Sequence, residues 1–202
     1  GALEVGGVRE QISGVNAGGG AYIMASSPIV ITESSIAQQT ELEFWAEDDN
    51  EASGLGDDDL PDNITVAAGV TLEASEGEVR LLAGDDIYLD ATATIISPTR
   101  IVIIGDYQPQ GVADPDPGIG TNIELYGTLQ APQIEISGGR DNDTILLDLK
   151  ALRGNTFVYG GEGSDLVTVN KLPSMTTYLG QDVAPGANGL PAFARDGTGR
   201  II

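Results

Sequence analysis

The chain has 202 residues, of which 31 are Asp or Glu and 9 are Lys or Arg, so its formal net charge is −22. This charge argues against nucleic acid and anionic membranes as partners, because like charges repel. Hydrophobic residues make up 41% of the chain, which argues against a disordered acidic tail. Cysteine and histidine are both absent, so the sequence offers no disulfide, no thiolate or imidazole metal ligand and no histidine general base.

Short stretches with alternating apolar residues recur along the chain, and helical periodicity is nearly absent. Glycine and proline punctuate these stretches, as turns between strands require. We expect residues 23–179 to form one β-solenoid. Residues 1–22 and 180–202, both rich in glycine, are expected to be an N-terminal and a C-terminal cap or linker.

The spacing is regular in the C-terminal half, where Ile123, Ile145 and Val167 are each 22 residues apart. A fixed period of this length is typical of a solenoid, whose stacked turns pair their strands in parallel. The predicted fold is therefore all-β, a single-stranded parallel β-helix (β-solenoid) with about 22 residues per rung. Crossovers between parallel strands are almost always right-handed, which predicts a right-handed coil.

Two insertions interrupt the period upstream, at about residues 47–62 and 107–120. The distance from Ile31 to Ile64 is 33 residues, or 22 plus 11, which places these two residues at the same position of successive rungs. Both insertions are rich in turn-forming residues, and we expect them to be loops that leave the solenoid near one corner.

The alternation of apolar residues also predicts which side chains face the interior. The expected core residues are Ile29, Ile31, Leu42, Phe44, Ile64, Val66, Val79, Leu81, Ile87, Leu89, Ile123, Leu125, Ile134, Ile136, Ile145, Leu147, Val158, Val167 and Val169. Residues 101–104 are apolar throughout, so the pattern does not distinguish which pair of them faces inward.

Two glycine–aspartate motifs are the most specific feature of the sequence. Gly160–Thr168 reads Gly-Gly-x-Gly-x-Asp-x-apolar-x, and Gly138–Leu146 differs from this pattern by Asp141 at the third glycine. Because the motifs are 22 residues apart, stacking would bring Asp143 and Asp165 about one rung apart. Carboxylates and glycine-turn carbonyls supply the hard oxygen ligands that calcium prefers, so this corner is a candidate calcium site.

These motifs resemble the calcium-binding repeats of the repeats-in-toxin family, over residues 138–168 of the chain. In that family the motif recurs about every nine residues, whereas here it recurs after 22 residues and on one corner. The resemblance implies that two stacked corners bind calcium through carboxylates and backbone carbonyls. The ligands that the resemblance implies are Gly139, Asp141, Asp143, Gly161, Gly163 and Asp165. Weaker candidates are Asp85 and Asp86 at a shorter corner, and Asp57 and Asp59 in the first insertion.

A plainer interpretation of the same corners is that glycine and aspartate form tight turns. Aspartate side chains accept hydrogen bonds from nearby backbone N–H groups and so stabilise such turns without a metal. The sequence leaves both interpretations open.

Residues 78–95, EVRLLAGDDIYLDATATI, resemble the repeats of filamentous-haemagglutinin-like adhesins. In those proteins parallel solenoids build long stalks on the bacterial surface. The resemblance implies an extracellular or cell-surface bacterial protein, with neighbouring domains of a longer chain, like subunits or cell-surface glycans as partners.

The combined expectation is a structural, calcium-stabilised module of a large adhesin or surface filament, without enzymatic activity. Two alternatives remain: a carbohydrate-active parallel β-helix or its sugar-binding remnant, and a subunit of a self-assembling fibre. A groove for acidic sugars would need aromatic platforms and basic residues, but the chain has one Trp and its nine basic residues are scattered. Carboxylates that point outward do not by themselves indicate a catalytic site, because the outward positions of a half-buried strand are polar by default.

Overall fold

The computed structural model of the chain describes residues 3–5, 14–26, 28–48, 61–109, 118–170 and 177–180. Within them every regular element is a β-strand, and every strand pairing is parallel. Most of both insertions and of the expected C-terminal cap, part of the expected N-terminal cap, and Asp57 and Asp59 lie outside the described residues.

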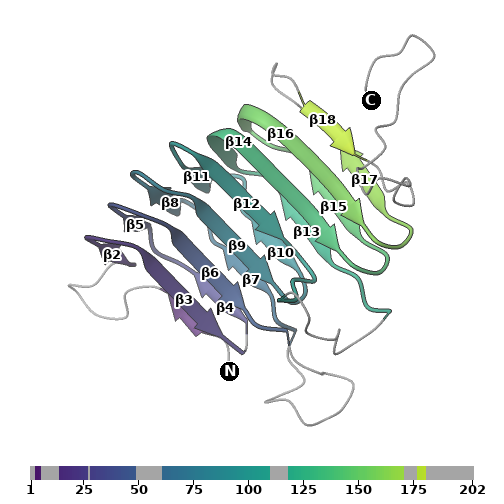
Figure 1. The fold of residues 1–202 in the computed structure, drawn as a ribbon, viewed down its shortest axis with the longest axis horizontal. Helices are drawn as coiled ribbons and strands as arrows, with labels where there is room; N and C mark the ends of the chain where they lie inside the picture. Colours follow the sequence, from purple (N-terminus) through teal and green to yellow (C-terminus); the bar gives the residue numbers. More distant parts are fainter. Residues whose placement is uncertain are drawn as a thin grey trace.

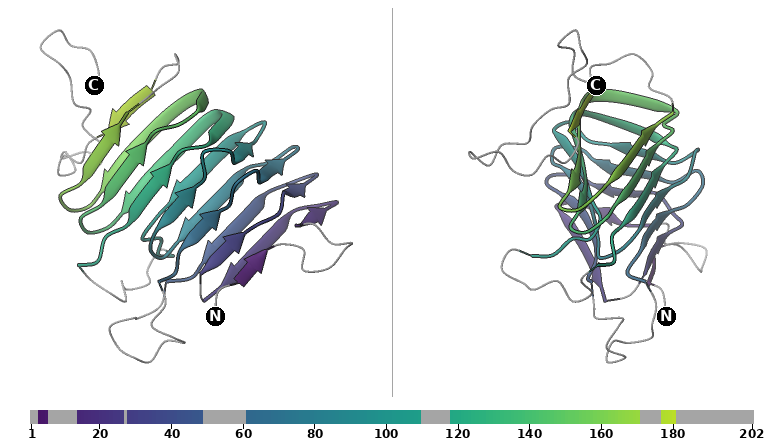
Figure 2. Two further views of the ribbon diagram at one scale, coloured as in Figure 1. Left: turned by 180° about the vertical axis from the view of Figure 1, so that it is seen from behind. Right: turned by 90° about the vertical axis from the view of Figure 1, so that its right-hand side faces the viewer.

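The strands form two sheets that surround a common interior, an arrangement consistent with the expected parallel β-helix (Figures 1 and 2). The chain passes from one sheet to the other and returns to the first beside its own previous strand. The seven-stranded sheet has the order β1-β4-β7-β10-β13-β15-β17. Its strands are β1 Leu3–Val5, β4 Ile29–Ile31, β7 Ile64–Val66, β10 Ile87–Leu89, β13 Asn122–Leu125, β15 Thr144–Leu147 and β17 Leu166–Val169.

The eleven-stranded sheet consists of two ladders. One contains β2 Asn16–Ala17, β5 Ser35–Ala37, β8 Thr71–Ala74 and β11 Thr94–Ile96. The other contains β3 Ala21–Ala25, β6 Leu42–Ala46, β9 Val79–Ala83, β12 Arg100–Ile104 and β18 Thr177–Gly180. Two longer strands, β14 Thr128–Gly139 and β16 Ala151–Gly161, run through both ladders. Strands β1 and β2 therefore lie within residues 1–22, the segment expected to be a cap or linker, and β3 begins at its end.

Apolar side chains from both sheets fill the interior. The expected core residues from Ile29 to Val158 are fully buried, and Val167 and Val169 pack against this core while partly buried. In the ambiguous stretch, Ile101 and Ile103 are buried in the core and Ile104 lies at the surface, partly exposed. Period-two alternation thus predicted the inward residues correctly, because each strand has one buried face.

The register across the first insertion differs from the expectation. Ile64 pairs with Ile29, and Val66 pairs with Ile31, so the expected equivalence of Ile31 and Ile64 is wrong by two residues. A shift of two residues keeps the same side chains facing inward, and for that reason the alternation of apolar residues could not detect it.

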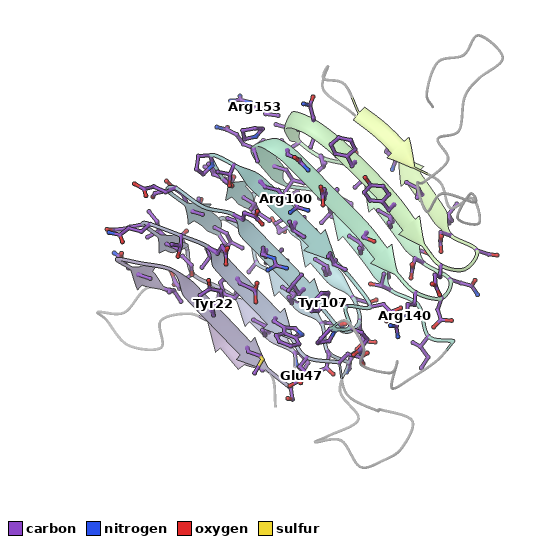
Figure 3. The ribbon with its side chains drawn as sticks, in the orientation of Figure 1. Tyr22, Glu47, Arg100, Tyr107, Arg140 and Arg153 are labelled. Carbon is purple, nitrogen blue, oxygen red and sulfur yellow. The ribbon has the colours of Figure 1, made fainter. Side chains whose placement is uncertain are left out.

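The outer face of the ladder β3-β6-β9-β12 brings together charges that are scattered in the sequence. The Arg80 guanidinium lies 2.9 Å from the Glu43 carboxylate. Arg100, which Figure 3 shows in the middle of this face, pairs with Glu135 and lies 3.8 Å from Glu78. These cross-strand pairs fix neighbouring strands side by side, although pairs exposed to solvent contribute little stability.

The core predicts the effect of a single truncation. Ile87 is fully buried between its register partners Ile64 and Ile123. The substitution Ile87→Ala should lower the unfolding free energy of the protein by about 2–5 kcal/mol, because it leaves a cavity. The neighbouring outward substitution Thr65→Ala should cost less than about 1 kcal/mol. Denaturant titration of both variants checks this, and equal losses would contradict the inward assignment of Ile87.

Candidate functional site: an acidic corner

The corner before the seven-stranded sheet carries one column of polar residues. Each member lies two residues before a strand residue of that sheet that pairs with its equivalent in the next rung. For example, Asp62 and Asp85 precede Ile64 and Ile87, which pair with each other. We call this set the aspartate column; it consists of Asp62, Asp85, Thr121, Asp143 and Asp165. Its first four members are buried, and Asp165 is partly exposed. In-register stacking therefore places carboxyl groups one above another at a corner largely shielded from water.

Side chains of the column bind the backbone of the preceding rung. The Asp165 carboxylate accepts a hydrogen bond from the Asp143 N–H at 3.0 Å, and the Asp143 carboxylate accepts one from the Thr121 N–H at 2.8 Å. Asp85 accepts a hydrogen bond from the Asp62 N–H in the same way. Backbone N–H groups at a corner cannot join a strand ladder, so these carboxylates satisfy donors that would otherwise be buried without a partner.

The glycines of the motifs make room for these carboxylates. A Cβ at Gly138 would overlap the Oδ2 of Asp143, and a Cβ at Gly160 would overlap the Oδ2 of Asp165. The first glycine of each motif is therefore needed because a side chain would not fit there, and not because of an unusual backbone angle. Its missing Cβ leaves room for the side chain of the aspartate five residues later.

The third glycine of the motif is required by the backbone angle. Gly163 has φ of 111°, and Asp141, which replaces glycine at the equivalent position, has φ of 55°. Aspartate tolerates this left-handed region better than most residues, because its short side chain makes local hydrogen bonds. Here the Asp141 carboxylate accepts a hydrogen bond from the Gly118 N–H at 2.9 Å.

Burial and crowding of like charges change the ionisation of the corner. The pKa of Asp143 is raised from 3.8 to about 8, chiefly by burial and in smaller part by the charges of Asp165, Asp106 and Asp141. The hydrogen bond from the Thr121 N–H acts in the opposite direction and lowers this pKa. The Asp143 Oδ2 atom has no hydrogen-bond partner in the described part of the chain. A proton or a cation at this oxygen would relieve the repulsion.

The other predicted ligands also bind backbone groups. Asp86 follows Asp85 of the aspartate column, and its carboxylate accepts a hydrogen bond from the Asn122 N–H at 2.7 Å. The carbonyl of Gly139 accepts a hydrogen bond from the Glu162 N–H at 3.1 Å, and Gly161 pairs with Gly139 in register. The described residues contain no group of three or more acidic side chains placed to hold a metal ion. The aspartate side chains of the corner thus accept hydrogen bonds from backbone N–H groups, which is what the plainer interpretation of the sequence expects.

Three residues of the corner lie outside the two glycine–aspartate motifs. Asp62 and Thr121 belong to the aspartate column, and Asp106 accepts a hydrogen bond from the backbone N–H of Arg140 at 2.8 Å. Figure 3 shows Arg140 at the edge of the stack where this corner lies. The signal for Thr121 was present, because it lies 22 residues before Asp143. Asp62 and Asp106 are separated from the motifs by the insertions, which hide the period.

Comparison of the chain with known protein families, with curated proteins and with solved structures finds no match. Among the described residues there is no helix of the length and apolarity needed to cross a membrane.

The space requirement at the first glycine can be tested by adding one methyl group. Gly138→Ala should destabilise the fold by about 1–3 kcal/mol, because the new Cβ displaces the Asp143 carboxylate. Gly18→Ala is the matched control, since no heavy atom lies within 4 Å of a Cβ there. Thermal unfolding of both variants gives the comparison; similar midpoints for the two would refute the close approach of Asp143 to Gly138.

The raised pKa of Asp143 predicts a pH dependence. Stability from the protonated carboxyl is fully present below about 3.8, the unfolded value, and is lost as the pH rises through about 8. Asp143→Asn keeps an acceptor for the Thr121 N–H and removes the charge. In chelator, the variant should therefore unfold at nearly the wild-type temperature at pH 4 and at a clearly higher temperature at pH 9. A difference that does not grow with pH would show that Asp143 titrates normally.

Proposed function

We propose that this chain is a structural, calcium-stabilised extracellular module of a large bacterial adhesin or surface filament. The observation that carries the proposal is the aspartate column, in which the fold itself stacks buried carboxyl groups at one corner. The net charge of −22 adds a general repulsion that opposes compaction. A fold with this charge distribution gains stability from a divalent cation, and calcium is abundant outside cells.

The donor chemistry of the corner fits calcium. Carboxylate and carbonyl oxygens are the ligands that calcium takes, in sets of six to eight. The Asp143 Oδ2 atom is buried and makes no hydrogen bond within the described residues, and its neighbour in the next rung is Asp165. Because these residues form no cluster of three carboxylates, an ion here would complete its ligands with backbone carbonyls and water.

The aspartates and the ion would have different roles at this corner. Asp143 and Asp165 each hold one oxygen on a backbone N–H of the preceding rung, which joins successive rungs. A bound calcium ion would offset the repulsion between these carboxylates. Because such an ion binds the folded coil and not the extended chain, its binding free energy adds to the stability of the fold.

The same proposal includes the finer features of the coil and its location. We propose a right-handed coil with about 22 residues per rung, since register partners such as Ile123 and Ile145 differ by 22 residues. In a calcium-poor cytoplasm a proton on Asp143 would offset the crowded charge, and outside the cell calcium would replace that proton and stabilise the coil. The module then serves as a stiff spacer that carries neighbouring domains of a longer chain.

Thermal unfolding with and without calcium tests the proposal. In calcium at about 100 times its Kd the wild type should gain about 2.7 kcal/mol, which corresponds to a rise of roughly 5–10 °C in Tm, relative to excess chelator. The calcium-dependent rise should be lost in Asp165→Ala.

The exposed Glu162→Gln variant changes the charge of the same turn without touching the column, and it should keep the full calcium-dependent rise. Comparing calcium-dependent increments, rather than absolute midpoints, separates loss of the ion from loss of the hydrogen bond to Asp143. If the wild-type midpoint is the same in calcium and in chelator, the proposal is wrong and the corner is only a set of turns capped by hydrogen bonds.

A further inference from the structure

A polar hollow lies on the outer face of the seven-stranded sheet, over β7, β10 and β13. Its volume is about 200 Å³, and it opens on the outer face beside the aspartate column, whose members Asp62, Asp85 and Thr121 each precede a lining residue. The polar side chains that line it are Asn63, Thr65, Asp86, Tyr88, Asn122 and Glu124. Thr65, Tyr88 and Glu124 are register partners on adjacent strands, so the parallel pairing sets the three side by side.

The side chains of the hollow hold one another in place. The Glu124 carboxylate accepts hydrogen bonds from the Asn122 amide at 3.3 Å and from the Tyr126 hydroxyl at 3.2 Å. The Asn63 amide oxygen accepts the Asp86 N–H at 2.8 Å. A ligand would therefore meet polar groups that are already oriented, and less side-chain freedom would be lost when it binds.

An aromatic platform borders the same hollow. The rings of Tyr88 and Tyr126 lie 5.8 Å apart between centroids at an interplanar angle of 54°. Tyr88 points outward from β10 and is 38% exposed, which leaves its ring available for contact. A tyrosine ring offers an apolar face and a polar hydroxyl to the same ligand.

Electrostatics restrict what this hollow can hold. Asp86 and Glu124 lie on the lining, no Lys or Arg among the described residues lies on it, and the whole chain carries a charge of −22. Anionic ligands such as uronates and phosphates are therefore repelled. An uncharged ligand with several hydroxyls and one apolar face matches amide and carboxylate acceptors beside a tyrosine ring.

We propose that this hollow is a subsite for one ring of a neutral saccharide. Its volume lies below the roughly 300–1,000 Å³ of sites that enclose a whole drug-sized ligand, so a single sugar ring of a longer glycan fits it. The register partners beyond the lining are Val30 on β4 and Leu146 on β15, which bound the polar patch along the stack.

The test is binding of the intact chain to an immobilised panel of neutral hexose and N-acetylhexosamine oligosaccharides, with uronate-containing oligosaccharides as charged counterparts. Calcium is kept at a millimolar level so that every variant is compared under one condition. At least one neutral glycan should be retained, and the uronate glycans should not. Tyr88→Ala should weaken retention by about tenfold or more, and Tyr88→Phe, which keeps the ring, by less.

Tyr22→Ala is the matched control, because Tyr22 is 64% exposed and lies on the outer face of the other sheet. Figure 3 labels its position. It should leave binding unchanged. Circular dichroism confirms that each variant keeps the wild-type fold. The proposal is overturned if no neutral glycan binds at millimolar concentration, if uronate glycans bind equally well, or if Tyr88→Ala binds like the wild type.

Discussion

In-register parallel pairing between successive rungs is the constraint on which the rest of the structure depends. It places residues that share a rung position directly above one another, as it does for Ile64, Ile87 and Ile123. For apolar residues this stacking is favourable, and it builds a continuous core. For charged residues the same stacking concentrates repulsion. The acidic corner is the point where this geometry conflicts with the charge of the chain.

The corner resolves part of this conflict with hydrogen bonds. Backbone N–H groups at the turn need acceptors, and the carboxylates of Asp143 and Asp165 supply them one rung away. Each aspartate thus joins two rungs, and a glycine without a Cβ leaves room for it. Repulsion remains between the stacked carboxyl groups, as the raised pKa of Asp143 reflects. A proton or a calcium ion at this corner would offset that repulsion.

Much of the fold could be predicted from the sequence because each strand has one buried face. Alternation identified the inward residues, and the 22-residue spacing of Ile123, Ile145 and Val167 identified the parallel stack. The register across the first insertion could not be predicted, since a shift of two residues leaves the inward face unchanged.

The candidate site was predictable only in part. The motifs identified Asp143 and Asp165 as stacked neighbours, but they could not show that each would bind a backbone N–H group. Nor could they identify Asp62, which an insertion separates from the periodic region. The hollow under Tyr88 was hidden for a different reason, because its lining comes from three strands that are distant in sequence.

Calorimetric titration of calcium near pH 7, repeated in buffers of different ionisation enthalpy, tests the central claim most directly. If Asp143 holds a proton that calcium replaces, about one proton should be released per ion bound, and Asp143→Asn should release none. Calcium binding without proton release, with the same heat in the variant, would contradict a site at this corner. If no binding heat is measured, calcium does not bind, and the proton on Asp143 is what offsets the repulsion between the stacked carboxyl groups.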